Sequence, residues 1–215
     1  CLNKISLGVN SIKSSVFNCP PYETLLDEHS PGLRQNIIDP IFSEIEIFIP
    51  DFLSSVLEKQ AKEPPPMNLN GPFHIKKQEA LGRVLMENIG FDFNQGRLDT
   101  SLHPFSGGTP EDLRITTRYN TEDFTTGLMG ILHETGHALY EKNLPKKWRY
   151  QPVGQARGMD IHESQSLLIE MQVCRSREFL AFAVPFMKKI LTKEGPEWSA
   201  DNLYRISTIV KPGLI

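Results

Sequence analysis

The sequence lacks the features that mark several classes of protein. None of its apolar runs approaches the roughly 18 to 20 residues needed to span a bilayer, and its start does not combine a basic segment with an apolar core and a cleavage site. Lysine and arginine are scattered, and the formal net charge is -3. This charge pattern gives no reason to expect nucleic acid or an anionic membrane as a partner. We therefore expect a soluble protein.

Cysteine is also scarce. The 3 cysteines, Cys1, Cys19 and Cys174, are odd in number and show no close-spaced metal-ligand pattern, so they indicate no disulfide framework. Cys174 falls within an apolar helical pattern, which favours a small buried side chain over a nucleophile. This cysteine usage fits a reducing, cytoplasmic location best.

Most of the chain shows helical periodicity. Residues Asp39 to Leu57 follow it, with Pro50 expected to bend or split the helix, and Ile75 to Asn88 form a second predicted helix. Gly90 is placed to cap the second helix. Residues Cys1 to Pro21 have no clear period, so we expect little order there.

The second half of the chain begins with a change of pattern. Residues Leu113 to Tyr119 alternate and are rich in β-branched and aromatic side chains, which predicts a short strand. Asn120 can cap a helix that ends before Pro145, and a last long helix should begin near Asp160 and bend at Pro185. Apolar residues mark the buried face of the first of these helices: Phe124, Leu128, Ile131, Leu132 and Leu139.

That helix carries the segment His133-Glu134-Thr135-Gly136-His137. His133 and His137 are four residues apart, so on a helix they share one face and can reach the same metal. Glu134 lies about 100 degrees further round, where it faces a water on the metal rather than the metal. Such a string also arises by chance on charged helix faces, but the small and apolar neighbours argue against a solvated charged face here. The pattern therefore predicts two zinc ligands and a general base.

A catalytic zinc ion usually has three protein ligands and one open position. The downstream candidates for the third ligand are Glu141, Asp160, Glu163 and Glu170. Glu141 is the weakest because it shares the first helix, whereas Glu163 lies far enough along the chain for a second helix to return antiparallel. Glu170 would lie on the same face two turns after Glu163 and could orient a ligand histidine by accepting its second ring proton.

Four ordered motifs give the sequence a family resemblance. They are His103-Pro104-Phe105, then Asp112 to Tyr119, then His133 to His137, then His162 to Ser166. The sequence resembles the carboxypeptidase Taq family of metallocarboxypeptidases, from about Pro21 to Ile215.

The resemblance implies a function and a site. It identifies His133, His137 and Glu163 as metal ligands and Glu134 as the catalytic base, with zinc or cobalt as the metal. It also implies a mainly α fold with a deep groove, a helix bearing the His-Glu motif and a short β region beside the site. The implied protein is a cytoplasmic homodimer that removes single C-terminal residues from peptides with broad specificity.

Two further residues stand in these motifs. His103 and Arg114 are candidates for contacting the substrate or shaping the site. Each also has a structural explanation, because a histidine before proline can cap a loop and Arg114 can pair with Asp112.

The ends of the chain depart from the family pattern. The family continues into motifs that help bind the substrate's C-terminal carboxylate, and its usual N-terminal helical region is replaced by residues 1–20, which do not look like the family. We therefore expect a fragment: an atypical segment over residues 1–20 and a partial catalytic domain over residues 21–215. Two alternatives are a zinc oligopeptidase or endopeptidase, and an inactive fragment that only binds metal.

Overall fold

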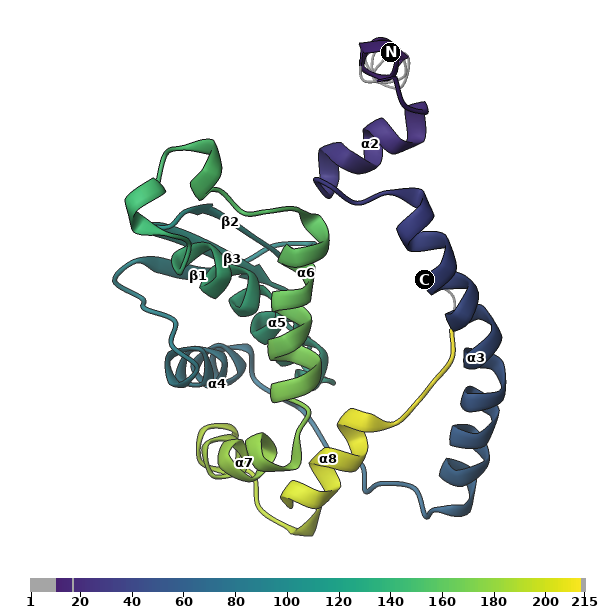
Figure 1. The fold of residues 1–215 in the computed structure, drawn as a ribbon. Helices are drawn as coiled ribbons and strands as arrows, with labels where there is room; N and C mark the ends of the chain where they lie inside the picture. Colours follow the sequence, from purple (N-terminus) through teal and green to yellow (C-terminus); the bar gives the residue numbers. More distant parts are fainter. Residues whose placement is uncertain (1–10, 17, 214–215) are drawn as a thin grey trace. The chain divides into compact units, whose positions relative to one another are not determined.

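The computed structural model describes residues 11–16 and 18–213 and shows a mainly α chain with one small sheet, as the sequence predicts (Figure 1). The chain divides into two compact units. The first comprises residues 1–63 and 157–161, and the second comprises residues 64–156 and 162–215. No helix among the described residues is long and apolar enough to cross a membrane.

The first unit is helical. Residues 11–16 are helical, in contrast to the low order expected there, and residues 1–10 lie outside the described part of the chain. Helix α2 spans Pro21–His29 and helix α3 spans Gln35–Lys62. Pro50 lies inside α3 without splitting it, so one helix forms rather than two.

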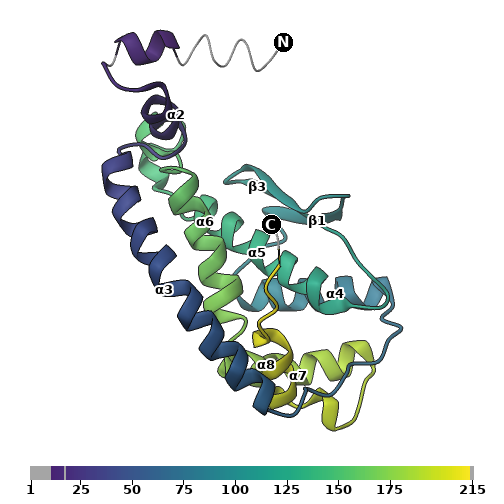
Figure 2. The same ribbon diagram turned by 90° about the vertical axis from the view of Figure 1, so that its right-hand side faces the viewer.

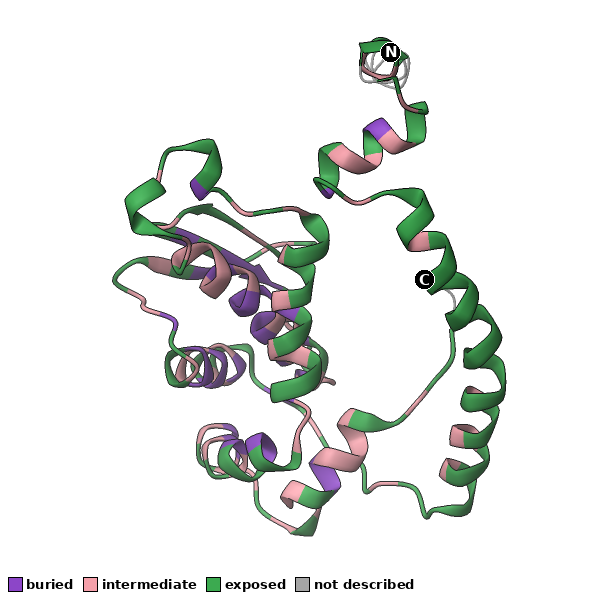
Figure 3. Cartoon of the chain, in the orientation of Figure 1, coloured by how far each residue is buried: buried purple, intermediate pink, exposed green. Residues whose placement is uncertain are grey.

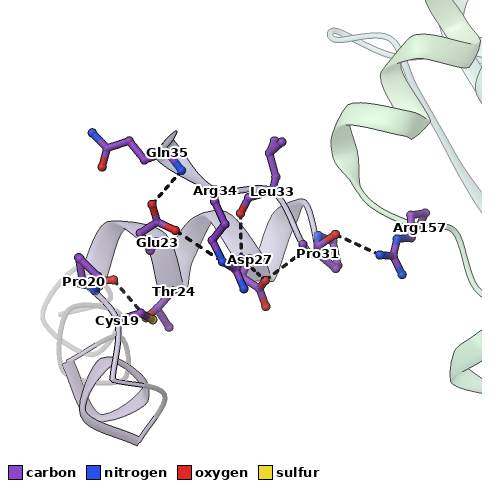
Figure 4. A network of polar contacts seen from close by, with 11 residues as sticks. Cys19, Pro20, Glu23, Thr24, Asp27, Pro31, Leu33, Arg34, Gln35 and Arg157 are labelled. Atoms are coloured by element: carbon purple, nitrogen blue, oxygen red, sulfur yellow. Dashed lines mark hydrogen bonds and ion pairs between the residues drawn. The ribbon is translucent and has the colours of Figure 1, made fainter. Parts of the chain in front are cut away.

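Polar contacts fix the turn between α2 and α3 (Figure 4). Asp27 accepts a hydrogen bond from the Gly32 backbone at 3.1 Å and pairs with Arg34. Arg157, which belongs to the same unit, donates to the carbonyl oxygen of Pro31 at 3.2 Å. These bonds hold together segments far apart in the sequence.

The second unit contains the sheet, which Figure 2 shows beside helix α5 (Phe124–Lys142). Strands β1 (Gly96–Thr100), β2 (Phe105–Thr109) and β3 (Asp112–Thr117) lie in the order β1-β3-β2, with β1 parallel and β2 antiparallel to β3. The predicted strand is therefore confirmed as β3. The sequence did not reveal β1 or β2, because the segments Gly-Arg-Leu-Asp-Thr and Phe-Ser-Gly-Gly-Thr lack a run of β-branched residues.

Helices make up the rest of the second unit. They are α4 (Ile75–Asn88), α5 (Phe124–Lys142), α6 (Met159–Leu167, which starts in the first unit), the π-helical segment η3 (Leu168–Val173), α7 (Arg177–Leu191) and α8 (Ala200–Thr208). Short 3-10 turns occur at Lys146–Trp148, Pro152–Gly154 and Pro196–Trp198. The bounds of α4 are those predicted, and Gly90 follows it with a φ of 104°.

Two sequence predictions about helix ends were wrong. Asp123, rather than Asn120, caps α5, since its carboxylate accepts from the Thr125 backbone at 2.8 Å. The predicted last helix is not continuous: it is interrupted just before α7, where Ser176 caps a new helix, and Pro185 lies within α7.

Helix α5 lies at the centre of the second unit, and the buried residues gather around it (Figure 3). On one side Ile131 and Ala138 pack with Ile115 of β3, and on another Leu128 and Leu132 pack with residues of α4 and α7. Leu139 is only partly buried. Because α5 is fixed from several sides, the polar side chains on its remaining face are held in place.

Cys174 provides a test of this core. Its side chain is 0% exposed, and burial raises the pKa of its thiol to about 12, which confirms the expected structural role. We expect Cys174 in the native protein to react with a thiol reagent at least about 100-fold more slowly than the partly exposed Cys19. Peptide mapping after timed labelling distinguishes the two cysteines, and equal labelling of both would contradict the packing described.

Candidate metal centre

Three side chains converge where α5 meets α6. His133 and His137 stand one turn apart on α5, with ring centroids 5.0 Å apart. Glu163 of α6 faces both: one carboxylate oxygen lies 3.7 Å from His133 Nε2 and the other 3.2 Å from His137 Nε2. Within the described part of the chain this is the one group of three such residues whose ligand atoms all lie within 4.8 Å of one another.

The geometry of this group suits a divalent metal ion. Ligands at about 2.0 to 2.1 Å from a tetrahedral zinc lie about 3.3 Å from one another, close to the separations found here. Two imidazole nitrogens and one carboxylate oxygen also leave the fourth position open, as a catalytic zinc site requires. The side chain of Glu163 is 50% exposed, so its carboxylate can be reached from solvent.

Glu134 projects from α5 beside the group and does not belong to it. The residue is only 8% exposed, and burial raises the pKa of its carboxyl group above the ordinary glutamate value. The Ser106 hydroxyl of β2 acts on the pKa of Glu134 in the opposite direction. A carboxyl group with raised proton affinity suits a group that takes up a proton during a reaction.

The ring of His133 is held from its other nitrogen. Glu170, in the π-helical segment, lies 3.0 Å from His133 Nδ1, and Arg175 donates to the second oxygen of Glu170 at 2.6 Å. The hydrogen bond to Glu170 raises the pKa of His133, and the same bond lowers the pKa of Glu170. This contact is the one that the spacing of Glu170 predicted. No pattern in the sequence pointed to Arg175.

The ring of His137 is also held from its other nitrogen. Its Nδ1 lies 2.6 Å from Nδ1 of His162, and His162 Nε2 lies 2.9 Å from Glu141. Burial lowers the pKa of His137, which favours the neutral ring that binds metal. Glu141 therefore contacts the site through His162 rather than joining the ligand group. In the sequence, this contact was indicated only by the position of Glu141 four residues after His137, on the same side of a helix.

Close packing of α5 on α6 keeps the group together. A Cβ atom on Gly136 would lie 2.7 Å from Ser166 Cα and 2.8 Å from the carbonyl oxygen of Gln165. These are backbone atoms that cannot turn away. Gly136 thus permits the helix approach that places Glu163 opposite the two histidines.

The two candidates from the other motifs have different positions. His103 is exposed and acts electrostatically on the Glu134 carboxyl group, whose pKa is shifted mainly by burial. Arg114 alternates with Ile115 along β3, and Ile115 faces α5, so Arg114 projects from the opposite face of the sheet, where it pairs with Asp112 at 2.7 Å. The structure therefore brings His103 near the group and does not bring Arg114 there.

Comparison with known proteins gives the family. Residues 9–215 match the family described as Carboxypeptidase Taq (M32) metallopeptidase. The chain belongs to this family. The match begins ahead of Pro21, so the expectation that the residues before Pro20 fall outside the family was wrong from residue 9 onward. The domain boundary expected at residue 21 stays a prediction.

Individual M32 proteins are similar over most of the chain. The chain is 36% identical over 195 residues to thermostable carboxypeptidase 1 of Thermus thermophilus, and the matched region covers 90% of this chain and 38% of that protein. It is 34% identical over 200 residues to carboxypeptidase 1 of Bacillus subtilis, with 91% and 39% covered. The solved structure of Trypanosoma cruzi metallocarboxypeptidase 1 superposes with a TM-score of 0.93 at 41% identity, covering 99% of this chain and 44% of that one. The chain thus spans about two fifths of the length of these M32 relatives.

Proposed function

We propose that the protein is a zinc-dependent carboxypeptidase whose metal is held by His133, His137 and Glu163, with Glu134 as the catalytic base. The observation that carries the proposal is the convergence of two imidazole nitrogens and a carboxylate beside a separate buried carboxyl group. Membership of a metallopeptidase family supports it. The named relatives are carboxypeptidases, which supports cleavage at the C-terminal end of a peptide.

In this proposal, the chain's own residues orient the metal and move a proton. Zinc, when bound, supplies a Lewis acid that activates water and polarises the scissile carbonyl. Glu134 takes the proton from the attacking water and delivers it to the leaving amine, which its raised pKa favours. Glu170 holds the proton of His133 on Nδ1, so that Nε2 presents its lone pair to the metal.

Several finer points belong to the same proposal. Cobalt could replace zinc, since both accept nitrogen and oxygen ligands. We infer broad specificity for the released residue, a cytoplasmic location and a homodimer from the family resemblance. Substrate contacts by His103 and Arg114 stay predictions. The nearness of His103 to Glu134 supports the first of these contacts.

Removal of metal tests the proposal. We expect dialysis of the protein at its natural length against a chelator to abolish release of C-terminal residues, and added zinc to restore it, because activation of water depends on the metal. Peptides with a free C-terminus are compared with the same peptides blocked at both ends. Undiminished release without metal would contradict the proposal, and internal cleavage of the blocked peptide would favour the endopeptidase alternative. The same assay and a zinc determination on residues 1–215 test whether this chain only binds metal.

A further inference from the structure

His162 occupies a position that the proposed chemistry does not use. It immediately precedes Glu163 on α6, and its ring lies between His137 and the last turn of α5. Its two nitrogens have different partners: Nδ1 faces His137 Nδ1 at 2.6 Å, and Nε2 faces a Glu141 oxygen at 2.9 Å. The ring of Tyr140 meets the His162 ring edge-on, at 5.2 Å between centroids and 89° between planes. The ring is therefore fixed on several sides.

The roles of these nitrogens follow from the metal site. A neutral imidazole has one nitrogen that donates and one that accepts. His137 turns Nε2 toward Glu163, 3.2 Å away, so metal binding requires that nitrogen to be free of a proton. The proton of His137 must then lie on Nδ1, and it can be donated only to an acceptor.

The Nδ1 atom of His162 supplies this acceptor only in one of the two tautomers of its ring. If Nδ1 of His162 accepts, its own proton must lie on Nε2, where Glu141 accepts it at 2.9 Å. Glu141 thus selects the tautomer of His162, and His162 in turn selects that of His137. All four ring nitrogens of the two histidines then have a single consistent role.

We propose that His162 and Glu141 are positioning residues that hold His137 in the tautomer and ring orientation needed to bind the metal. This inference rests on the proposed function, since it assumes a metal at His133, His137 and Glu163. The pair mirrors Glu170 at the other ligand histidine, but acts through an intervening ring.

The spacing of the residues explains how the chain builds this arrangement. His137 and Glu141 are four residues apart on α5 and lie on the same side of the helix. His162 meets both of them from α6, one residue before Glu163. The contact therefore orients His137 and also fixes the start of the helix that supplies the third ligand.

Zinc affinity measures the proposed role directly. We expect His162→Phe, which keeps an aromatic ring beside Tyr140 but removes the acceptor, to weaken zinc binding by about 10- to 100-fold. Glu141→Ala should weaken it by about tenfold, because the tautomer of His162 is then free to change. His74→Phe, at an exposed position before α4, is the matched control and should leave zinc affinity unchanged. Affinity is measured by competition with a chromophoric chelator, on the protein at its natural length.

Two additional readouts separate positioning from simple packing. Nitrogen-15 NMR of the zinc-loaded protein should show a proton on His137 Nδ1 whose hydrogen-bonded chemical shift is lost in His162→Phe, while the melting temperature of the metal-free variant stays close to that of the wild type. Unchanged zinc affinity in both His162→Phe and Glu141→Ala would overturn the positioning role of His162 and Glu141 but not the proposed function. Failure of the wild type to bind zinc would overturn the proposed function itself. If His162→Phe does not fold, the zinc affinity of Glu141→Ala and the His137 Nδ1 signal in that variant decide.

Discussion

Changing Glu134 to glutamine is expected to lower the turnover number by about 10²- to 10⁴-fold while leaving the zinc content unchanged. Glutamine has nearly the same shape as glutamate, but its amide cannot accept the proton of the attacking water. Glu134 is outside the group of ligand atoms, so its charge is not needed to hold the metal. The loss should therefore fall on turnover, with little change in zinc affinity.

The measurement compares turnover, Michaelis constant and zinc content in Glu134→Gln, the wild type and a control. Glu87→Gln makes the same chemical change at an exposed position in α4 and should behave like the wild type. A Glu134→Gln variant that keeps most of its turnover would show that another group takes the proton. A variant that loses its zinc would show that Glu134 is a ligand.

Changing Gly136 to alanine is expected to destabilise the protein by about 1 to 3 kcal/mol and to weaken zinc binding. The added Cβ would lie 2.7 Å from Ser166 Cα and 2.8 Å from the carbonyl oxygen of Gln165. Both of these atoms belong to the backbone of α6. Helix α6 must then move away from α5, and Glu163 moves with it. The loss of zinc affinity should follow because the ligand separations no longer suit one ion.

Gly130 is the matched control for this change. It lies on the same helix, and a Cβ atom there would meet no atom within 4 Å. Gly130→Ala should therefore stabilise the protein by up to about 1 kcal/mol through helix propensity alone. Denaturant unfolding and zinc competition measure both variants. Equal stability of the two alanine variants would contradict the close approach of α5 and α6.

Much of the metal centre could be predicted from the sequence because local spacing determines it. The interval between His133 and His137 places both on one helix face whatever surrounds the helix, and helix α4 was predicted to the residue because its periodicity and Gly90 agree. The contact of Glu170 with His133 also follows from spacing along a second helix. The choice of Glu163 needed the family resemblance.

Other features depend on contacts that no local pattern contains. Strand β2, with two glycines, forms because it pairs with β3, and this pairing brings Ser106 to Glu134. Arg175 reaches Glu170 across a π-helical turn that ordinary helical spacing does not anticipate. The start of α5 was assigned to the wrong cap because Asn120 and Asp123 both suit that position, and only the observed bond to the Thr125 backbone decides between them.

A zinc titration of the wild type and of Glu163→Ala tests the proposed metal centre most directly, with Glu178→Ala, at an exposed position in α7, as the control. We expect one zinc ion per chain in the wild type and in the control. Zinc affinity should fall by at least about 100-fold in Glu163→Ala, because two histidines alone do not complete the site. Wild-type affinity in Glu163→Ala, or no stoichiometric zinc in the wild type, would contradict the assignment of the metal centre to His133, His137 and Glu163.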